Sequence, residues 1–334
     1  MKFVYLLIII IVVFNILGIY SYIKFTPNVD TLDNFKLLKK YLTLRNKYIQ
    51  DIDRYTFDKD IYKKKLSNIP IYFINLPRSK ERRRFIIKQM KDYNISNYKI
   101  VDAIYGANKQ PTGNKNMYKI EMKPKKQILF YNNDQLAKNG EIGCTLSHLN
   151  TILQAYNNNL EYVIICEDDV DLYWIKTWDI NLQDLILNAP KDWEYISLKV
   201  HDNRPTSKYG PYGKYQTTAA QILNRNGMKK ILDNCYKNGI FILDRKENKV
   251  GKTILNILFP ITNFFNLQSQ TTVIAADNYI PSLLNSYVYH KTLVPTYNNY
   301  KNMNSTIHEN QTQSHLEHSI TDIQELYTNF NYSK

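Results

Sequence analysis

The chain has 334 residues, of which 44% are hydrophobic and 13% aromatic, and its formal net charge at pH 7 is +14. This apolar content suffices for a buried core, so the composition excludes disorder over the whole chain. The charge alone would suggest a nucleic-acid partner, but the lysines and arginines are scattered and accompany no nucleic-acid fold signature. A basic solvated surface, or attraction to anionic lipid or nucleotide phosphates, accounts for the charge equally well. We therefore predict no nucleic-acid partner.

An almost uninterrupted apolar segment runs from Phe3 to Ile23, with lysines at both flanks. About 20 helical residues, each rising about 1.5 Å, span a hydrocarbon core of roughly 30 Å. A cleaved signal peptide is the alternative, but its apolar run is normally shorter and is followed by a small-residue cleavage site. We therefore predict a transmembrane anchor over residues 1–24.

Residues 25–66 are polar, charged and helix-prone, with only a narrow, interrupted stripe of apolar side chains. Two interpretations remain open for them: a stem between membrane and catalytic domain, or an ordinary first helix packed on that domain. The folded domain is predicted over residues 67–307, and residues 308–334 are predicted to be a polar, peripheral C-terminal tail. Residues 106–139 lack periodicity and are interpreted as a long surface excursion.

Short, mainly apolar runs, among them the wholly apolar Ile71–Ile74 and Tyr162–Cys166, alternate with amphipathic segments inside the predicted domain. Runs of this kind are typical of strands buried in a parallel sheet. They lie at Ile71–Ile74, Tyr98–Val101, Tyr162–Cys166, Tyr195–Val200 and Ile240–Leu243. Helices are predicted after Ser79, a candidate N-cap, from about Leu146, and near Gly227–Cys235. The alternation predicts an α/β fold with a mostly parallel central sheet, covered on both faces.

Three successive carboxylates, Glu167, Asp168 and Asp169, follow directly on the apolar strand that ends at Cys166. Ligands of open α/β sheets collect outside the carboxyl ends of strands, and adjacent buried carboxylates need a counter-ion. A hard cation such as Mn²⁺ or Mg²⁺ suits such oxygen ligands. Alternation along an extended chain puts Glu167 and Asp169 on one side, so we predict Asp169 as the direct metal ligand. Glu167 or Asp168 is then expected on the ribose side or in the outer shell. An isolated acidic triplet is more often a solvated turn or helix cap.

The wider pattern overturns that simpler interpretation. The segment Ile71–Arg83, the segment Gly140–His148 and the run Glu167–Val170 together resemble glycosyltransferase family 25. The resemblance implies a GT-A-like fold that binds a nucleotide sugar, a UDP-sugar donor (most often UDP-galactose) and usually Mn²⁺. It therefore predicts transfer of a hexose to a protein or glycan acceptor. The alternative is a catalytically inactive surface or adhesion protein that retains the fold.

Carried over residue by residue, the resemblance also predicts the site. At the end of the first strand it implies donor contacts from Asn75, Leu76, Arg78 and Arg82. At the start of the second motif it implies donor contacts from Glu141, Gly143, Ser147 and His148. Donor contact is also assigned to Asp168, and the metal to Glu167 and Asp169. An arginine at the end of the first strand can neutralise phosphate or stack on uracil. His148 has an equally open alternative role as a structural histidine.

Ala276-Asp277 is similar to a later Val-Asp pair of the family, so Asp277 is predicted as a catalytic base or acceptor contact. The alternative role for Asp277 is a helix N-cap. Two features depart from the family pattern: Lys199 stands where a glycine is expected, and Asp244–Gln270 has no obvious counterpart. Both affect the acceptor side more than the donor side.

The cellular location follows from the anchor and from the resemblance, which disagree on orientation. Four lysines within the residues just after the apolar segment, against Lys2 before it, disfavour a lumenal C-terminal part by the positive-inside rule. Glycosyltransferases of this layout usually face a lumen. We expect a single-pass membrane protein with its catalytic domain in a secretory-pathway lumen or on the exterior.

Overall fold

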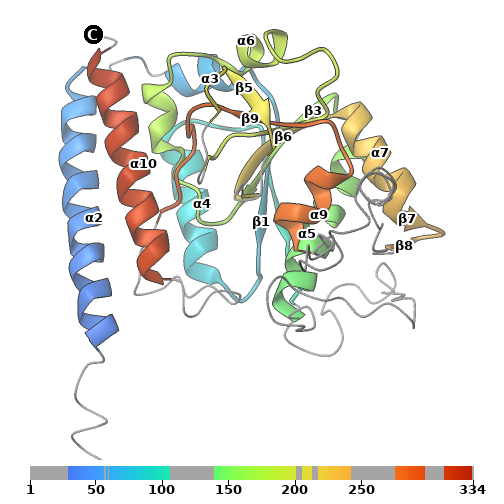
Figure 1. The fold of residues 1–334 in the computed structure, drawn as a ribbon, viewed down its shortest axis with the longest axis horizontal. Helices are drawn as coiled ribbons and strands as arrows, with labels where there is room; N and C mark the ends of the chain where they lie inside the picture. The colour runs from blue at the N-terminus through green and yellow to red at the C-terminus, as the bar shows by residue number, and fades with distance from the viewer. Residues whose placement is uncertain are drawn as a thin grey trace, which may run out of the picture.

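A mixed seven-stranded sheet forms the centre of the part of the chain that the structure, a computed structural model, describes (Figure 1). The described residues are 29–55, 58, 60–105, 139–200, 205–212, 217–241, 275–297 and 312–332. The strands are β1 (Ile71–Asn75), β2 (Tyr98–Asp102), β3 (Tyr162–Glu167), β4 (Tyr195–Ser197), β5 (Tyr209–Pro211), β6 (Ala220–Asn224) and β9 (Ser286–Tyr289). They are ordered β2-β1-β3-β6-β4-β9-β5, and β5 and β6 run against the other five. The prediction of an α/β fold with a mostly parallel sheet is therefore confirmed.

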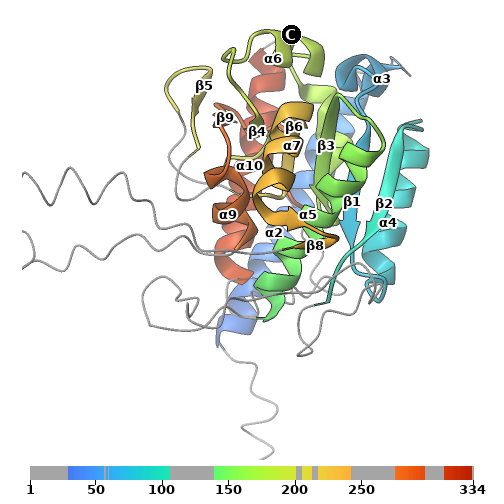
Figure 2. The ribbon, with the colours of Figure 1, turned by 90° about the vertical axis from the view of Figure 1, so that its right-hand side faces the viewer.

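Alternate side chains of the central strands pack on opposite faces, as the two-residue period of a strand requires. Ile71 and Phe73 face one hydrophobic core, while Tyr72 and Ile74 face a second. The first core lies under α3 (Ile61–Leu66), α4 (Lys80–Asp92), the 3-10 helix η1 (Leu172–Thr177) and α6 (Leu182–Leu187). The second lies under α5 (Asn139–Asn157), α7 (Arg225–Cys235) and α9 (Ala276–Ser282), which stand together in Figure 2. A small hairpin of β7 (Tyr236–Lys237) and β8 (Ile240–Phe241) extends from α7.

Two long helices, α2 (Val29–Asp53) and α10 (Thr312–Tyr332), lie side by side at one edge of the molecule (Figure 1). Tyr48 stacks on Tyr327 with ring centroids 4.0 Å apart. Together with η1 the pair encloses a third hydrophobic core. Within residues 25–66, α2 thus packs against α10 and η1.

Residues 308–334 were predicted to be a polar, peripheral tail, but the described residues of this segment form a helix with a buried apolar face. They form α10, whose buried apolar side chains repeat every three or four positions: Leu316, Ile320, Ile323, Leu326 and Phe330. The last four belong to the core that α10 shares with α2. The helix is therefore amphipathic. The average polarity of the segment hides this pattern, because many polar residues lie between the apolar ones.

Several predicted segments lie outside the described residues. They are the anchor over residues 1–24, all but the last residue of the excursion 106–139, and the insertion Asp244–Gln270. Among the helices that are described, none combines the length and the hydropathy that crossing a membrane requires.

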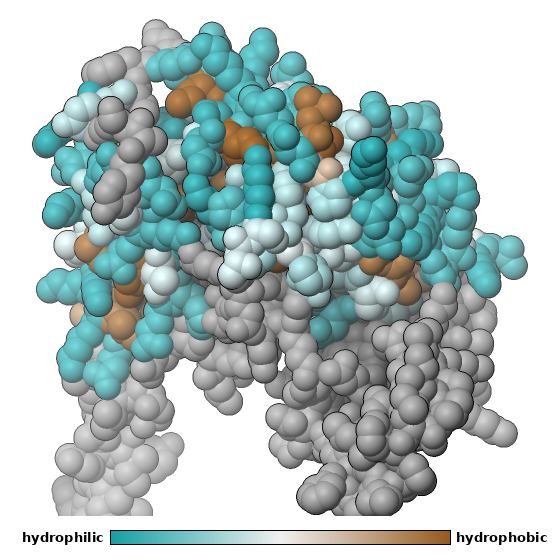
Figure 3. All heavy atoms as spheres, turned by 45° about the horizontal axis from the view of Figure 1, so that its top comes forward, coloured by the Kyte–Doolittle hydropathy of each residue, from teal (hydrophilic) through white to brown (hydrophobic). Residues whose placement is uncertain are grey.

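The outer surface seen in Figure 3 is mostly hydrophilic, with separate hydrophobic spots. Among the described residues, the exposed large hydrophobic side chains are Phe35 on α2, Tyr55 just after α2, Ile87 on α4 and Leu187 on α6. Exposed apolar side chains that occur singly are normal on the surface of a folded protein.

Helix α7 approaches the residues before β4 so closely that Gly227 has no room for a side chain. A Cβ there would lie 2.5 Å from the carbonyl oxygen of Glu194. We expect Gly227→Ala to lower the free energy of unfolding by about 1–3 kcal/mol, because the helix must move away from backbone atoms. Urea unfolding measures the loss, and Asn226→Ala, at an exposed neighbouring position, is the control. Equal stability of the two variants would contradict the close approach.

Candidate active site at the end of strand β3

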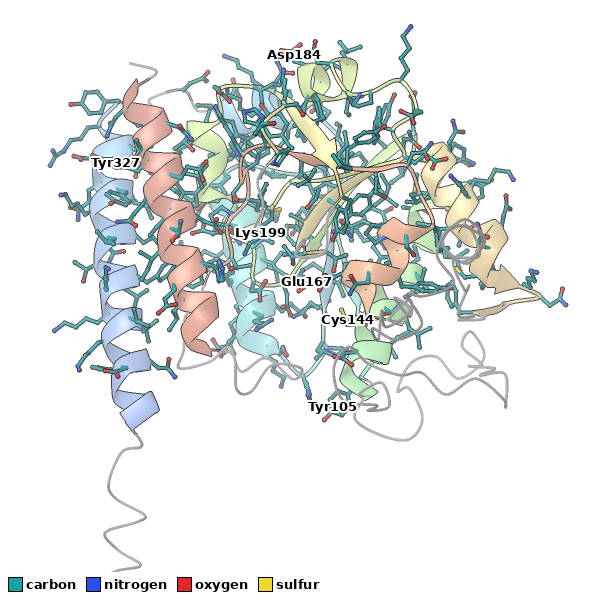
Figure 4. The ribbon with its side chains drawn as sticks, viewed as in Figure 1. Tyr105, Cys144, Glu167, Asp184, Lys199 and Tyr327 are labelled. Atoms are coloured by element: carbon teal, nitrogen blue, oxygen red, sulfur yellow. The ribbon has the colours of Figure 1, made fainter. Side chains whose placement is uncertain are left out.

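The acidic residues occupy the carboxyl end of β3, between β1 and β6. β3 runs parallel to β1, so that Ile74 pairs with Glu167 and Asn75 reaches the same end of the sheet. The strand stops at Glu167, whose backbone N–H donates to the carbonyl oxygen of Ala219 (2.8 Å). Asp168 and Asp169 form a turn, where the alternation of a strand no longer applies. In the view of Figure 4, Glu167 lies between the labelled Lys199 and Cys144.

Asp168 and Asp169 share one guanidinium. A nitrogen of Arg82 lies 2.5 Å from Oδ1 of Asp168 and 3.4 Å from Oδ2 of Asp169, and Asn75 donates its amide to Oδ2 of Asp168 (2.7 Å). We call Asn75, Arg82, Asp168 and Asp169 the arginine cluster. Burial by itself would lower the pKa of Arg82, but the charges of Asp169 and Asp168 raise it above its ordinary value. Arg82 therefore remains a cation.

Asp169 is the less compensated of the two aspartates. Its Oδ1 is buried and has no hydrogen-bond partner among the described residues. Burial, together with the charges of Glu167 and Asp168, raises the pKa of Asp169 to about 6, although the positive charge of Arg82 opposes the shift. Lys199 acts in the other direction; its Nζ donates to Oγ1 of Thr296 (2.9 Å). The site thus holds a carboxylate with an unused oxygen next to two fixed cations.

Glu167 points to a second group of side chains. His148 is fully buried, with Nε2 3.4 Å from Oε1 of Glu167 and Nδ1 3.1 Å from the amide nitrogen of Gln221. The sulfur of Cys144, a ring nitrogen of His148 and a carboxylate oxygen of Glu167 all lie within 4.8 Å of one another. Burial, and after it the charges of Glu167 and Asp277, raise the pKa of the Cys144 thiol well above its ordinary value. We call Cys144, His148, Glu167 and Gln221 the histidine cluster.

Asp277 reaches the same place from α9. Thr218 donates its backbone N–H (2.7 Å) and its hydroxyl (2.6 Å) to Oδ1 of Asp277, and the hydroxyl also lies 3.4 Å from Oε1 of Glu167. The N-cap of α9 is Ala275, so Asp277 is not a cap. Burial and the charge of Glu167 raise the pKa of Asp277.

The other residues predicted to touch the donor lie around these clusters. Ser147 is buried and structural in its contacts: its hydroxyl donates to the carbonyl oxygen of Gly143 (2.6 Å) and accepts from the backbone N–H of Ile104 (2.8 Å). The guanidinium of Arg78 covers the ring of Tyr105 at 3.6 Å. Leu76 and Glu141 are half-buried, and Gly143 is buried.

The sequence predicted no role for Thr218, Gln221 or Arg45. In the structure each of them contacts a side chain at or near the end of β3: Asp277, His148 and Asp171, respectively. Gln221 lies on β6 opposite Ile165 and is fully buried. The signal in the sequence was a single amide among apolar residues, since a buried amide needs hydrogen-bond partners. Arg45 lies on α2, and its Nε donates to Asp171, two residues beyond Asp169 (2.7 Å). Nothing local in the sequence pairs residues so far apart.

Residues 68–209, which contain both clusters except Gln221, match the model of glycosyltransferase family 25 (LPS biosynthesis protein). The resemblance to glycosyltransferase family 25 is thereby confirmed for this part of the chain. The chain is 34% identical to human "Procollagen galactosyltransferase 2" over 138 residues, which cover 41% of this chain and 21% of that protein. It is 28% identical to "Procollagen galactosyltransferase 1-B" of Xenopus laevis over 171 residues, or 51% of this chain and 27% of that protein. It is 33% identical to a "Putative glycosyltransferase" of Haemophilus influenzae over 130 residues, which cover 39% of each chain.

The matched segments therefore span between about a fifth and two fifths of these relatives. The family 25 region carries the three sequence motifs and the arginine cluster. It ends before Thr218 and Asp277, and it leaves out α2 and α10.

The raised pKa of Asp169 predicts how the free energy of unfolding changes with pH. The folded protein holds the Asp169 proton more tightly than the unfolded chain does. The contribution of this carboxyl group to the free energy of unfolding should therefore fall as pH rises from about 4 to about 6, by at most about 3 kcal/mol, and then stay constant. Urea unfolding of the wild type and of Asp169→Asn across this range gives the difference. A difference that does not vary with pH would contradict the prediction.

Proposed function

We propose that this protein is a glycosyltransferase that transfers a hexose, galactose in the first place, from a UDP-sugar to a protein or glycan acceptor. The observation that carries the proposal is the arginine cluster at the carboxyl end of β3, inside the family 25 region. The names of the procollagen galactosyltransferases support galactose as the sugar. Residues 67–307 form the catalytic domain in this proposal, with a GT-A-like arrangement of the nucleotide site.

The nucleotide is proposed to lie across the carboxyl ends of β1, β2 and β3, where open α/β sheets bind ligands. Arg78 and Tyr105, at the ends of β1 and β2, offer a cation and a ring to a uracil base. Asn75 and Arg82 hold Asp168 in place on the ribose side. The guanidinium of Arg82 also brings positive charge next to the diphosphate.

A divalent cation fits the residues of the arginine cluster. The buried Oδ1 of Asp169 lacks a hydrogen-bond partner among the described residues, and a carboxylate oxygen is the ligand type that Mn²⁺ and Mg²⁺ prefer. Asp169 is therefore the proposed first ligand, and Glu167 the second. When bound, such a cation stabilises the negative charge of the departing diphosphate.

Asp277 is proposed as the base that takes the proton of the acceptor hydroxyl. Its raised pKa makes it a stronger base than an ordinary aspartate. Thr218 fixes its orientation through two hydrogen bonds to Oδ1. A base in this position suits an inverting, single-displacement route. Membrane attachment through residues 1–24, with the catalytic domain in a lumen or on the exterior, is part of the same proposal.

A donor screen tests the function. The purified chain is incubated with single UDP-sugars and Mn²⁺, with a chelator arm, and the release of UDP is measured. One UDP-hexose should be consumed faster than the others, only with the cation, and Asp169→Asn should not consume it. UDP binding, seen as a Mn²⁺-dependent rise in melting temperature, without turnover of any donor or acceptor would favour the inactive surface protein instead. Turnover that is equal in the wild type and in the variant would refute the proposed site.

A further inference from the structure

The histidine cluster contains a ligand set that differs in chemistry from the carboxylates of the arginine cluster. Cys144 and His148 are four residues apart on α5, so both side chains lie on one face of the helix. Glu167 meets them from the end of β3. Thiolate, imidazole and carboxylate are together the ligands of Zn²⁺ and related ions, whereas Mn²⁺ and Mg²⁺ prefer oxygen alone.

The distances allow one ion to bind all three side chains. Ligand atoms of a tetrahedral zinc site lie about 3.5 Å apart, since the bonds measure about 2.0–2.3 Å. Nε2 of His148 already lies 3.4 Å from Oε1 of Glu167, and all three ligand atoms lie within 4.8 Å of one another. A closure of about 1 Å by the Cys144 side chain would complete the set.

An independent observation concerns the far side of the histidine ring. Gln221 is fully buried, and its Oε1 has no hydrogen-bond partner among the described residues, although its Nε2 lies 3.1 Å from Nδ1 of His148. If the amide turns over, Oε1 accepts from Nδ1–H, and the lone pair of the ring then sits on Nε2, toward Glu167. This is the outer-shell contact that orients histidines bound to a metal.

We propose that Cys144, His148 and Glu167 bind one borderline-soft divalent cation, with Zn²⁺ as the best match, and that Gln221 orients the histidine. The site shares Glu167 with the hard cation proposed at Asp169, differs from it in its thiolate and imidazole ligands, and goes beyond the proposed transferase activity. It ties the first turns of α5 to the end of β3. On binding, a sulfur–metal bond replaces the S–H bond of Cys144 and the proton passes to solvent. The charge of Glu167, which disfavours a bare thiolate, favours the cation.

Cobalt absorption tests the site in the full chain after removal of metal with a chelator. Titration with CoCl₂ should give a thiolate-to-cobalt charge-transfer band that saturates at one equivalent, and ZnCl₂ should remove it. Cys144→Ser should lose the band, whereas Cys235→Ser, a buried cysteine on α7, should keep it. Absence of the band in the wild type, or its persistence in Cys144→Ser, would overturn the proposal.

A second measurement needs no variant. Zn²⁺ should slow the alkylation of Cys144 by iodoacetamide in the wild type by about tenfold or more, as mapped by mass spectrometry, and Mn²⁺ should not. Equal labelling with and without Zn²⁺ would overturn the proposal. Neither readout involves a sugar donor, so a failure here and a failure of the transferase proposal can be told apart.

Discussion

Asp169→Asn should lower the turnover of the UDP-sugar by at least about a hundredfold while the protein stays folded. The substitution keeps the volume of the side chain and removes the negative charge beside Arg82. It also removes a ligand that the proposed cation needs. UDP release under saturating Mn²⁺ measures the effect.

The same substitution should not lower stability at neutral pH. The raised pKa of Asp169 means that the buried carboxylate costs folding free energy when it is ionised. Loss of activity together with unchanged or higher resistance to urea would therefore separate chemistry from misfolding. Asp92→Asn, the same change on the exposed side of α4, is the control and should keep normal turnover. Near-normal consumption of the donor by Asp169→Asn would remove Asp169 from the mechanism.

Arg45→Met should destabilise the protein by about 3–5 kcal/mol, because it leaves Asp171 buried without its cation. Asp171 is fully buried, and Nε of Arg45 lies 2.7 Å from its Oδ2. The guanidinium also covers the ring of Tyr297 at 4.8 Å, so methionine retains part of the packing but none of the charge. Urea unfolding measures the change.

Two further variants identify the cause. Arg45→Met combined with Asp171→Asn should recover part of the loss, since no buried charge then lacks a partner. Lys36→Met breaks an exposed pair with Asp33 on the same helix and should change stability by no more than about 0.5 kcal/mol. A loss of equal size in Arg45→Met and Lys36→Met would contradict the role of the buried ion pair.

Two ion pairs connect the outer helices α2 and α10 to charged residues near Asp169. Arg45 on α2 holds Asp171, and Asp322 on α10 lies 3.8 Å from Nζ of Lys199. Neither helix belongs to the region that matches family 25. Lys199, which departs from the family pattern, therefore has a partner in a helix that is also outside that pattern.

Local patterns in the sequence were sufficient for the strands and for the position of the acidic run. The apolar runs of β1 and β3 predicted buried strands, because continuous β-branched and aromatic residues suit a sheet covered on both faces. The carboxylates after β3 were placed at the end of the sheet by the same reasoning. The apolar spacing within α10 was equally local, but it was missed among polar residues.

Only the tertiary structure decided which side chains meet at that end. Because β3 stops at Glu167, Asp168 and Asp169 turn to Arg82 while Glu167 turns to His148, whereas alternation predicted Glu167 beside Asp169. Asp277 reaches Glu167 through Thr218 only because β6 lies antiparallel beside β3. The sequence by itself determined the kinds of element and the acidic strand end, since these depend on neighbouring residues. Pairing between strands and helices depends on contacts between distant residues, and those contacts divided the acidic run into two clusters.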